Sequence, residues 1–92
     1  MAKKAVKVII RGRVQGVGYR DWIERQARPA GLAGYVRNRR DGSVELVISG
    51  SDSQIAAMLE QCRQGPRLAA VEDLEVLADE WAGEGFSILP TA

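Results

Sequence analysis

The stretch Gly12-Arg-Val-Gln-Gly-Val-Gly-Tyr-Arg20 joins the first predicted strand to the first predicted helix and has the composition of an anion-binding loop. Gly12, Gly16 and Gly18 remove the Cβ atoms that would hinder tight backbone curvature and the approach of backbone N–H groups to a ligand. A helix start also leaves up to four N–H groups without internal partners and carries a partial positive charge. A cation is disfavoured there, so Arg20 points to an anion held between its guanidinium and the loop amides.

This loop matches neither of the common phosphate-binding patterns. It lacks the Lys-Ser/Thr of a P-loop, and its glycines do not have the G-x-G-x-x-G spacing. Two interpretations of Arg20 therefore stay open at this point. The residue types favour an anion held in a small phosphate cradle. The other interpretation is a surface salt bridge to an acidic neighbour or to a chain terminus, and such pairs contribute little to stability.

The composition excludes several classes of catalytic and metal site. The 92 residues include no histidine, which excludes Ser-His and Cys-His nucleophile systems and histidine metal sites. The single cysteine, Cys62, excludes an internal disulfide, and its place on an apolar helical stripe favours a buried core thiol over a nucleophile. No run approaches the roughly 18 apolar residues of a membrane span, and Met1-Ala2-Lys3-Lys4 is not followed by a signal-peptide apolar block. A soluble cytoplasmic protein is expected.

Charge is distributed unevenly along the chain. The formal net charge is +1, but residues 1–40 contain eleven Lys or Arg and two acids, whereas residues 41–92 contain two basic residues and ten acids. One interpretation is a pair of solvated faces of opposite sign. The other is that the N-terminal half builds an anion-attracting end of the molecule.

Hydrophobic periodicity predicts a βαββαβ order followed by a short C-terminal strand. The predicted strands cover residues 5–11, 35–39, 43–49, 71–78 and 86–89. The first predicted helix covers residues 21–28, with Pro29 and Gly31 closing it. The second begins after the capping side chains of residues 51–53 and ends at Gly65-Pro66. Between the second and third strands, Asp41-Gly42 is a strong signal for a two-residue hairpin.

Two strand–helix–strand units in this order most simply interlock as a split βαβ sandwich. Right-handed crossovers place both helices on one face of an antiparallel sheet, with the core strands in the order 4-1-3-2. The edge that the fifth strand joins cannot be derived from the pattern. Residues 1–92 are expected to form a single α+β domain.

A second motif downstream of the loop makes the chain resemble the acylphosphatase family. The stretch from Gly12 to Arg20 is followed by Gly34-Tyr-Val-Arg-Asn38 and Asp41-Gly-Ser-Val-Glu45, and the similarity continues in order to Phe86-Ser-Ile88. The resemblance implies the ferredoxin-like βαββαβ sandwich. It also implies that the protein hydrolyses acyl phosphates to a carboxylate and inorganic phosphate, without a metal or cofactor.

Carried over by position, the resemblance assigns the family's catalytic arginine to Arg20 and its catalytic asparagine to Asn38. The phosphate is then held by Arg20 and by the backbone amides of Gln15, Gly16, Val17, Gly18 and Tyr19. The chain departs from the family pattern elsewhere, at Pro29, in the run 37–40 and in the tail 90–92. A tail that folds back near Arg20 would alter access to the site.

The residue types suit this chemistry. An acyl phosphate leaves as a carboxylate, whose conjugate acid has a pKa of about 4, so no side chain needs to donate a proton. A bidentate arginine and fixed amides stabilise the charge of the transferring phosphoryl group. Our hypothesis is that Asn38 holds the attacking water in line while the bound phosphate takes up the proton. The other interpretation, a turn residue, is weakened because Asp41-Gly42 already supplies the turn and Asn38 lies within a strand.

The alternative function is a non-catalytic ferredoxin-like module that binds phosphate groups or RNA. RNA-binding domains of this fold stack bases on aromatics of the open sheet face, where Tyr35 is the only obvious candidate. Nucleic acid is thus disfavoured as a partner. The expected ligands are a small acyl phosphate and, at the loop, inorganic phosphate or sulfate; a monomer without membrane contact is expected. Arg37, Arg39 and Arg40 would either steer an anionic substrate or form a solvated hairpin.

Overall fold

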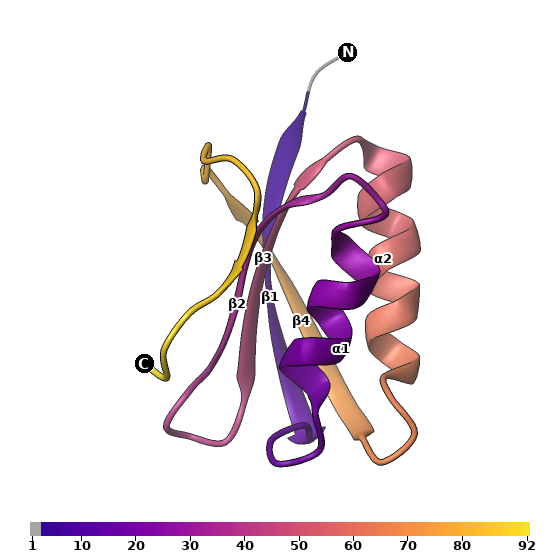
Figure 1. The fold of residues 1–92 in the computed structure, drawn as a ribbon, viewed down its shortest axis with the longest axis vertical. Helices are drawn as coiled ribbons and strands as arrows, with labels where there is room; N and C mark the ends of the chain where they lie inside the picture. Colours follow the sequence, from indigo (N-terminus) through magenta and orange to yellow (C-terminus); the bar gives the residue numbers. More distant parts are fainter. Residues whose placement is uncertain (1–2) are drawn as a thin grey trace.

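A computed structural model describes residues 3–92 (Figure 1); Met1 and Ala2, part of the segment examined for a signal peptide, lie outside the described residues. The helices and strands follow the predicted βαββαβ order with a short strand at the end. Their bounds are β1 Lys4–Arg13, α1 Tyr19–Ala27, β2 Ala33–Asn38, β3 Val44–Gly50, α2 Asp52–Gln64, β4 Ala70–Asp79 and β5 Phe86–Ile88. Neither helix within residues 3–92 has the length and apolar sequence that a membrane span needs.

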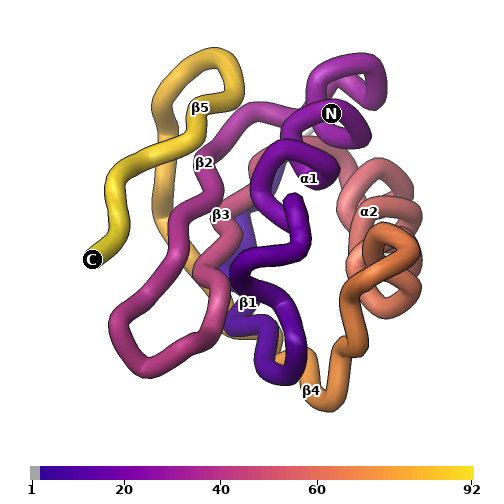
Figure 2. The backbone as a smooth tube through the Cα atoms, turned by 60° about the horizontal axis from the view of Figure 1, so that its bottom comes forward, coloured from indigo at the N-terminus to yellow at the C-terminus, as the bar shows by residue number. Residues whose placement is uncertain are grey.

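The sheet has the strand order β4-β1-β3-β2-β5, and its four core strands pair antiparallel in the predicted order 4-1-3-2. β5 pairs in parallel with the outer edge of β2, which makes the complete sheet mixed. After β4 the chain crosses from one edge of the sheet to the other (Figure 2) and enters β5 from the end at which β2 begins. That route explains why β5 runs parallel to its neighbour.

Both helices cover one face of the sheet, and the apolar residues of the two layers meet between them (Figure 1). The alternation in β1 places Val8 and Ile10 in this core without exposed surface. α2 contributes Ile55, Met58 and Cys62, as its predicted apolar stripe requires. Burial raises the pKa of the Cys62 thiol to about 12, so this cysteine is a neutral core residue, as expected.

α1 begins at Tyr19, two residues earlier than the helical periodicity predicts. Its N-cap, Gly18, has a φ of 75°, a left-handed conformation that lets the chain turn sharply from the loop into the helix. The helix ends at Ala27, because Pro29 has no N–H group with which to extend the hydrogen-bond ladder. Arg20 consequently stands in the first turn of α1.

The β2–β3 hairpin has a three-residue turn instead of the predicted two-residue turn. Its closing hydrogen bond runs from the Arg39 N–H to the Ser43 carbonyl at 2.9 Å, which leaves residues 40–42 in the turn. Gly42, with a φ of 93°, occupies the left-handed position that three-residue turns reserve for glycine. Asp41-Gly42 thus marks the place of the hairpin but not its length.

Candidate functional site

The β1–α1 loop, residues 14–18, turns through two glycines in the left-handed conformation. Gly16 has a φ of 73° and Gly18 a φ of 75°, where a residue with a Cβ is disfavoured by roughly 1–2 kcal/mol. A Cβ at either position would meet no atom within 4 Å, so the backbone conformation, and not crowding, requires glycine. The predicted tight curvature of this loop is confirmed.

The backbone N–H groups of this loop and of the first turn of α1 are available to a ligand. Within residues 3–92, no backbone or side-chain acceptor takes a hydrogen bond from the N–H groups of residues 15–20. The Trp22 N–H donates to the Gly18 carbonyl at 3.0 Å, where the ladder of α1 begins. Unpaired N–H groups at the positive end of a helix dipole favour an anion.

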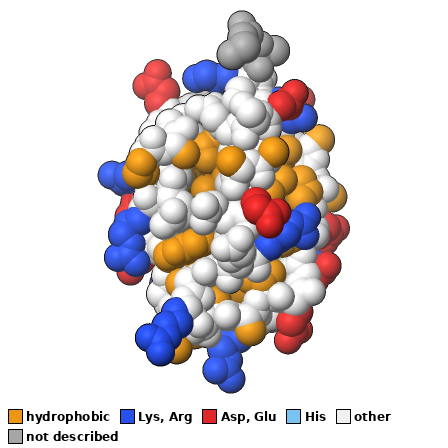
Figure 3. Space-filling model, turned by 90° about the vertical axis from the view of Figure 1, so that its right-hand side faces the viewer, with side chains coloured by type: hydrophobic (Ala, Val, Ile, Leu, Met, Phe, Trp, Pro, Cys, Tyr) orange, Lys and Arg blue, Asp and Glu red, His pale blue; other side chains and the backbone are white. Residues whose placement is uncertain are grey.

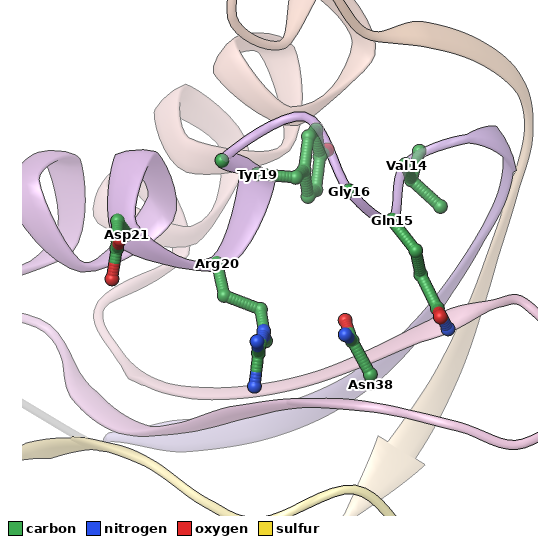
Figure 4. A pocket seen from close by; sticks show the side chains of 8 residues that line it. Val14, Gln15, Gly16, Tyr19, Arg20, Asp21 and Asn38 are labelled. Carbon is green, nitrogen blue, oxygen red and sulfur yellow. The ribbon is translucent and has the colours of Figure 1, made fainter.

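A pocket of about 110 Å³ lies between this loop and the end of β2 (Figure 4). It exceeds severalfold the roughly 10–15 Å³ that one water requires by the same measure. It is lined by Val14, Gln15, Gly16, Gly18, Tyr19, Arg20, Asp21 and Asn38. The pocket thus brings together all of the site residues expected from the sequence except Val17, whose side chain packs against the hydrophobic core.

Arg20 projects from the first turn of α1 toward the space that the side chain of Asn38 also faces (Figure 4). Among the described residues it forms no salt bridge, although Arg11, Arg28 and Arg37 each pair with an acid. The interpretation of Arg20 as half of a surface salt bridge therefore finds no partner within residues 3–92. Its positive charge, placed at the positive end of a helix, is left to be balanced by an anion.

The positive charge of the first forty residues is partly neutralised by acids from the rest of the chain. Four ion pairs join the two parts: Lys4–Asp52, Arg11–Asp73, Arg11–Glu75 and Arg37–Glu45. Figure 3 shows Lys or Arg side chains at the lower end of the molecule, where Figure 1 places the β1–α1 loop, but also at the upper end, and it shows Asp or Glu at the lower right. An anion-attracting end near the β1–α1 loop therefore stays a prediction beside that of two solvated faces of opposite charge.

Asn38 is the last residue of β2 and lies on the helix-covered side of that strand, as does the fully buried Val36. Its carboxamide points toward the β1–α1 loop (Figure 4). The Oδ1 atom is buried and accepts no hydrogen bond from any residue between 3 and 92. An unpaired buried acceptor costs about 1–3 kcal/mol. The cost is understandable if this oxygen serves a water or a ligand in the pocket.

The C-terminal tail runs beside β2 and not over the pocket. The Ala92 N–H donates to the Asn38 carbonyl at 3.0 Å, and the Arg40 N–H donates to the Ala92 carbonyl at 3.0 Å. Residues 89–92 are absent from the pocket lining. The tail therefore leaves access to Arg20 unaltered and holds the backbone of Asn38 from the outer side of β2.

Arg37 and Tyr35 lie on the sheet face opposite the pocket. Glu45 accepts a hydrogen bond from the Tyr35 hydroxyl at 2.7 Å and forms a salt bridge with Arg37 at 3.0 Å. Burial and this bond to Glu45 raise the pKa of Tyr35 to about 12. Arg37 is thus engaged within the fold, and the aromatic considered for RNA stacking is held by the same carboxylate. Arg39 and Arg40 are not among the residues that line the pocket.

Two side chains of the loop region make contacts that the sequence does not reveal. The Gln15 Nε2 donates to the carbonyls of Arg39 and Ser43, at 2.8 Å each. The Tyr19 hydroxyl donates to the Cys62 carbonyl at 2.7 Å and ties the start of α1 to the last turns of α2; burial raises the pKa of this tyrosine. All three bonds end on backbone carbonyls, so no residue type on the receiving side signals them.

The pocket offers N–H donors, one guanidinium and the carboxamides of Gln15 and Asn38, with Asp21 as the single acidic residue in its lining. In the part of the chain that the structure describes, no group of three or more His, Cys, Asp or Glu side chains could hold a metal ion. These groups can bind an oxyanion on one side and orient a water molecule on the other.

Comparisons with known proteins point to one family. The family model described as Acylphosphatase matches residues 6–88. A protein of Bradyrhizobium diazoefficiens named acylphosphatase is 51% identical over 98 aligned positions, which cover 99% of each chain. One of Azorhizobium caulinodans with the same name is 54% identical over 86 positions, covering 91% of this chain and 92% of that one. The crystal structure of acylphosphatase from Bacillus subtilis superposes with a TM-score of 0.88 at 33% identity, covering 96% of this chain and 99% of that one.

Proposed function

Because the chain belongs to the acylphosphatase family, we propose that its β1–α1 loop and Arg20 bind the phosphate group of an acyl phosphate. The enzyme hydrolyses acyl phosphates. The observation that carries the proposal is that the N–H groups of residues 15–20 and the side chain of Arg20 have no partner within residues 3–92, and that this loop lines a pocket together with Arg20 and Asn38.

Binding follows from charge and geometry. The N–H groups of the loop donate to phosphate oxygens, and the helix dipole of α1 adds positive potential at the same place. Arg20 donates two parallel N–H groups to the phosphate, a geometry that its planar guanidinium presents without reorganisation. These donors are fixed before the substrate arrives, so they can stabilise charge on the phosphoryl oxygens as the transition state forms. Inorganic phosphate or sulfate binds the same donors.

Hydrolysis requires a positioned water and little acid–base help. A water oxygen attacks phosphorus as the bond from phosphorus to the acyl oxygen breaks, and the bonding electrons leave with the carboxylate. A carboxylate is a stable leaving group, because its conjugate acid has a pKa of about 4. The Oδ1 of Asn38 accepts a hydrogen bond from the attacking water and holds it in line. The proton of the water passes to an oxygen of the phosphate being transferred.

We further propose that residues 1–92 act as a single acylphosphatase-like domain, monomeric and cytoplasmic. The single cysteine, which is buried and free, supports a compartment where disulfides are not required.

Hydrolysis of benzoyl phosphate in ¹⁸O-labelled water with excess EDTA tests this function. We expect full turnover in the chelator, with the label in inorganic phosphate and none in benzoate, because the water attacks phosphorus. Glycerol phosphate is the control and is expected to remain intact, since its alkoxide leaving group needs a proton donor that the pocket does not supply. Turnover that depends on added metal, or label in benzoate, would contradict the proposal.

A further inference from the structure

We infer that the side chain of Gln15 is a positioning residue that sets the distance between the phosphate-binding loop and Asn38. The inference rests on the proposed function, in which the loop holds the phosphate and Asn38 holds the water. It concerns the side chain of Gln15, whereas the proposed function uses only its backbone amide.

The sheet connects the two halves of the site only indirectly, through β3. β1 leads into the loop and β2 ends at Asn38, but β3 lies between these strands, so β1 and β2 share no hydrogen bonds. Both ladders to β3 end at the same residue, since Ile10 and Asn38 each pair with Val44. Within residues 3–92, strand pairing beyond this point continues between β1 and β4, up to Arg13, but not between β1 and the strands β3 and β2.

Gln15 spans this gap with both of its amide hydrogens. Its Nε2 donates to the Arg39 carbonyl and to the Ser43 carbonyl, at 2.8 Å each. These two residues close the hairpin, because the Arg39 N–H donates to the Ser43 carbonyl at 2.9 Å. Arg39 directly follows Asn38, so the carboxamide of Gln15 holds the backbone one residue away from the proposed water-binding group (Figure 4).

Loss of the Gln15 hydrogen bonds is expected to lower kcat more than the affinity for phosphate. The donors that bind phosphate lie in the loop and on α1. They remain together when the hydrogen bonds from Gln15 to the hairpin are lost. Asn38, however, can then move relative to the bound phosphate. A misplacement of about 1 Å in reacting groups costs on the order of 100-fold in rate.

A double-mutant cycle between Gln15→Met and Asn38→Ala tests the inference on benzoyl phosphate. Methionine keeps the length of the side chain and removes both N–H groups. We expect Gln15→Met to lower kcat by roughly 10- to 100-fold, with the inhibition constant of inorganic phosphate changed less than about threefold. In the Asn38→Ala background the same substitution is expected to change kcat less than about threefold, because its effect passes through Asn38.

Gln54→Met is the matched control. The Gln54 Nε2 also donates to a backbone carbonyl, that of Ala30, at 3.0 Å, but at a site away from the pocket. We expect this variant to lose stability and to keep the kinetic constants of the parent. If Gln15→Met does not fold, as judged by circular dichroism, Gln15→Asn replaces it, because that side chain keeps the amide but is one methylene too short to reach both carbonyls.

Two results separate failure of the inference from failure of the proposed function. Losses in kcat from Gln15→Met and Asn38→Ala that multiply, or a phosphate inhibition constant that rises as much as kcat falls, overturn the inference alone. An Asn38→Ala variant with the kcat of the parent overturns the proposed role of Asn38, and the inference with it.

Discussion

Arg20→Lys is expected to lower kcat/KM for benzoyl phosphate by roughly 1000-fold. The guanidinium stands in the first turn of α1, pairs with no acid within residues 3–92, and faces the pocket (Figure 4). A lysine keeps the charge but replaces a planar fork with a point charge, so it cannot make two parallel hydrogen bonds to the phosphoryl oxygens. Steady-state kinetics and inhibition by inorganic phosphate measure the loss, which should affect both binding and rate.

Arg25→Lys is the matched control for this prediction. Arg25 belongs to the same helix, is exposed, and is not among the residues that line the pocket. We expect this variant to keep the kinetic constants of the parent within about twofold, because it only replaces an exposed guanidinium with an exposed ammonium group. Arg20→Lys kinetics as close to the parent as those of Arg25→Lys would remove Arg20 from its proposed role.

Asn38→Ala is expected to lower kcat by about 100- to 1000-fold and to leave the inhibition constant of inorganic phosphate within about threefold. The Oδ1 of Asn38 is buried without a partner among the described residues, and the proposal uses it to hold the attacking water. In the same proposal, phosphate is bound by the loop on the other side of the pocket. The substitution also removes an unpaired buried acceptor, so the free energy of unfolding should rise or stay unchanged. Steady-state kinetics measure kcat and the inhibition constant, and urea denaturation of the same preparation measures the free energy of unfolding.

Tyr35→Phe controls for changes in β2 that do not concern the pocket. It removes the hydrogen bond to Glu45 on the opposite face of the same strand. We expect stability to fall by about 1 kcal/mol and kcat to stay that of the parent. A rise in KM for Asn38→Ala with an unchanged kcat would make Asn38 a binding group instead of a water-positioning group.

The sequence was sufficient to predict the two layers of the fold and the order of the four core strands. Alternation in β1 and helical spacing in α2 record which side of each element is buried, and burial is confirmed at Val8 and Met58. The position of β5 was not predictable, because a three-residue strand carries no pattern that distinguishes one sheet edge from the other. The length of the hairpin turn was predicted wrongly, since Asp-Gly suits both two- and three-residue turns.

The site could be predicted only as far as residue types carry a signal. Arg20 stood out because a cation is unfavourable at a helix start, whereas Asn38 was assigned through the resemblance to the acylphosphatase family. The side chain of Gln15 did not stand out, because its bonds go to carbonyls that every residue possesses. The salt bridge of Arg37 depends on its register opposite Glu45, which the wrongly predicted turn length obscured.

An NMR titration of the uniformly ¹⁵N-labelled protein with inorganic phosphate tests the central claim most directly. We predict that the largest shifts fall on the backbone amides of residues 15–20 and on the side-chain amide of Asn38, and that they saturate together with a single dissociation constant. Saturable shifts that spare these groups and fall on other parts of the surface, such as Lys3 and Lys4, would contradict the account.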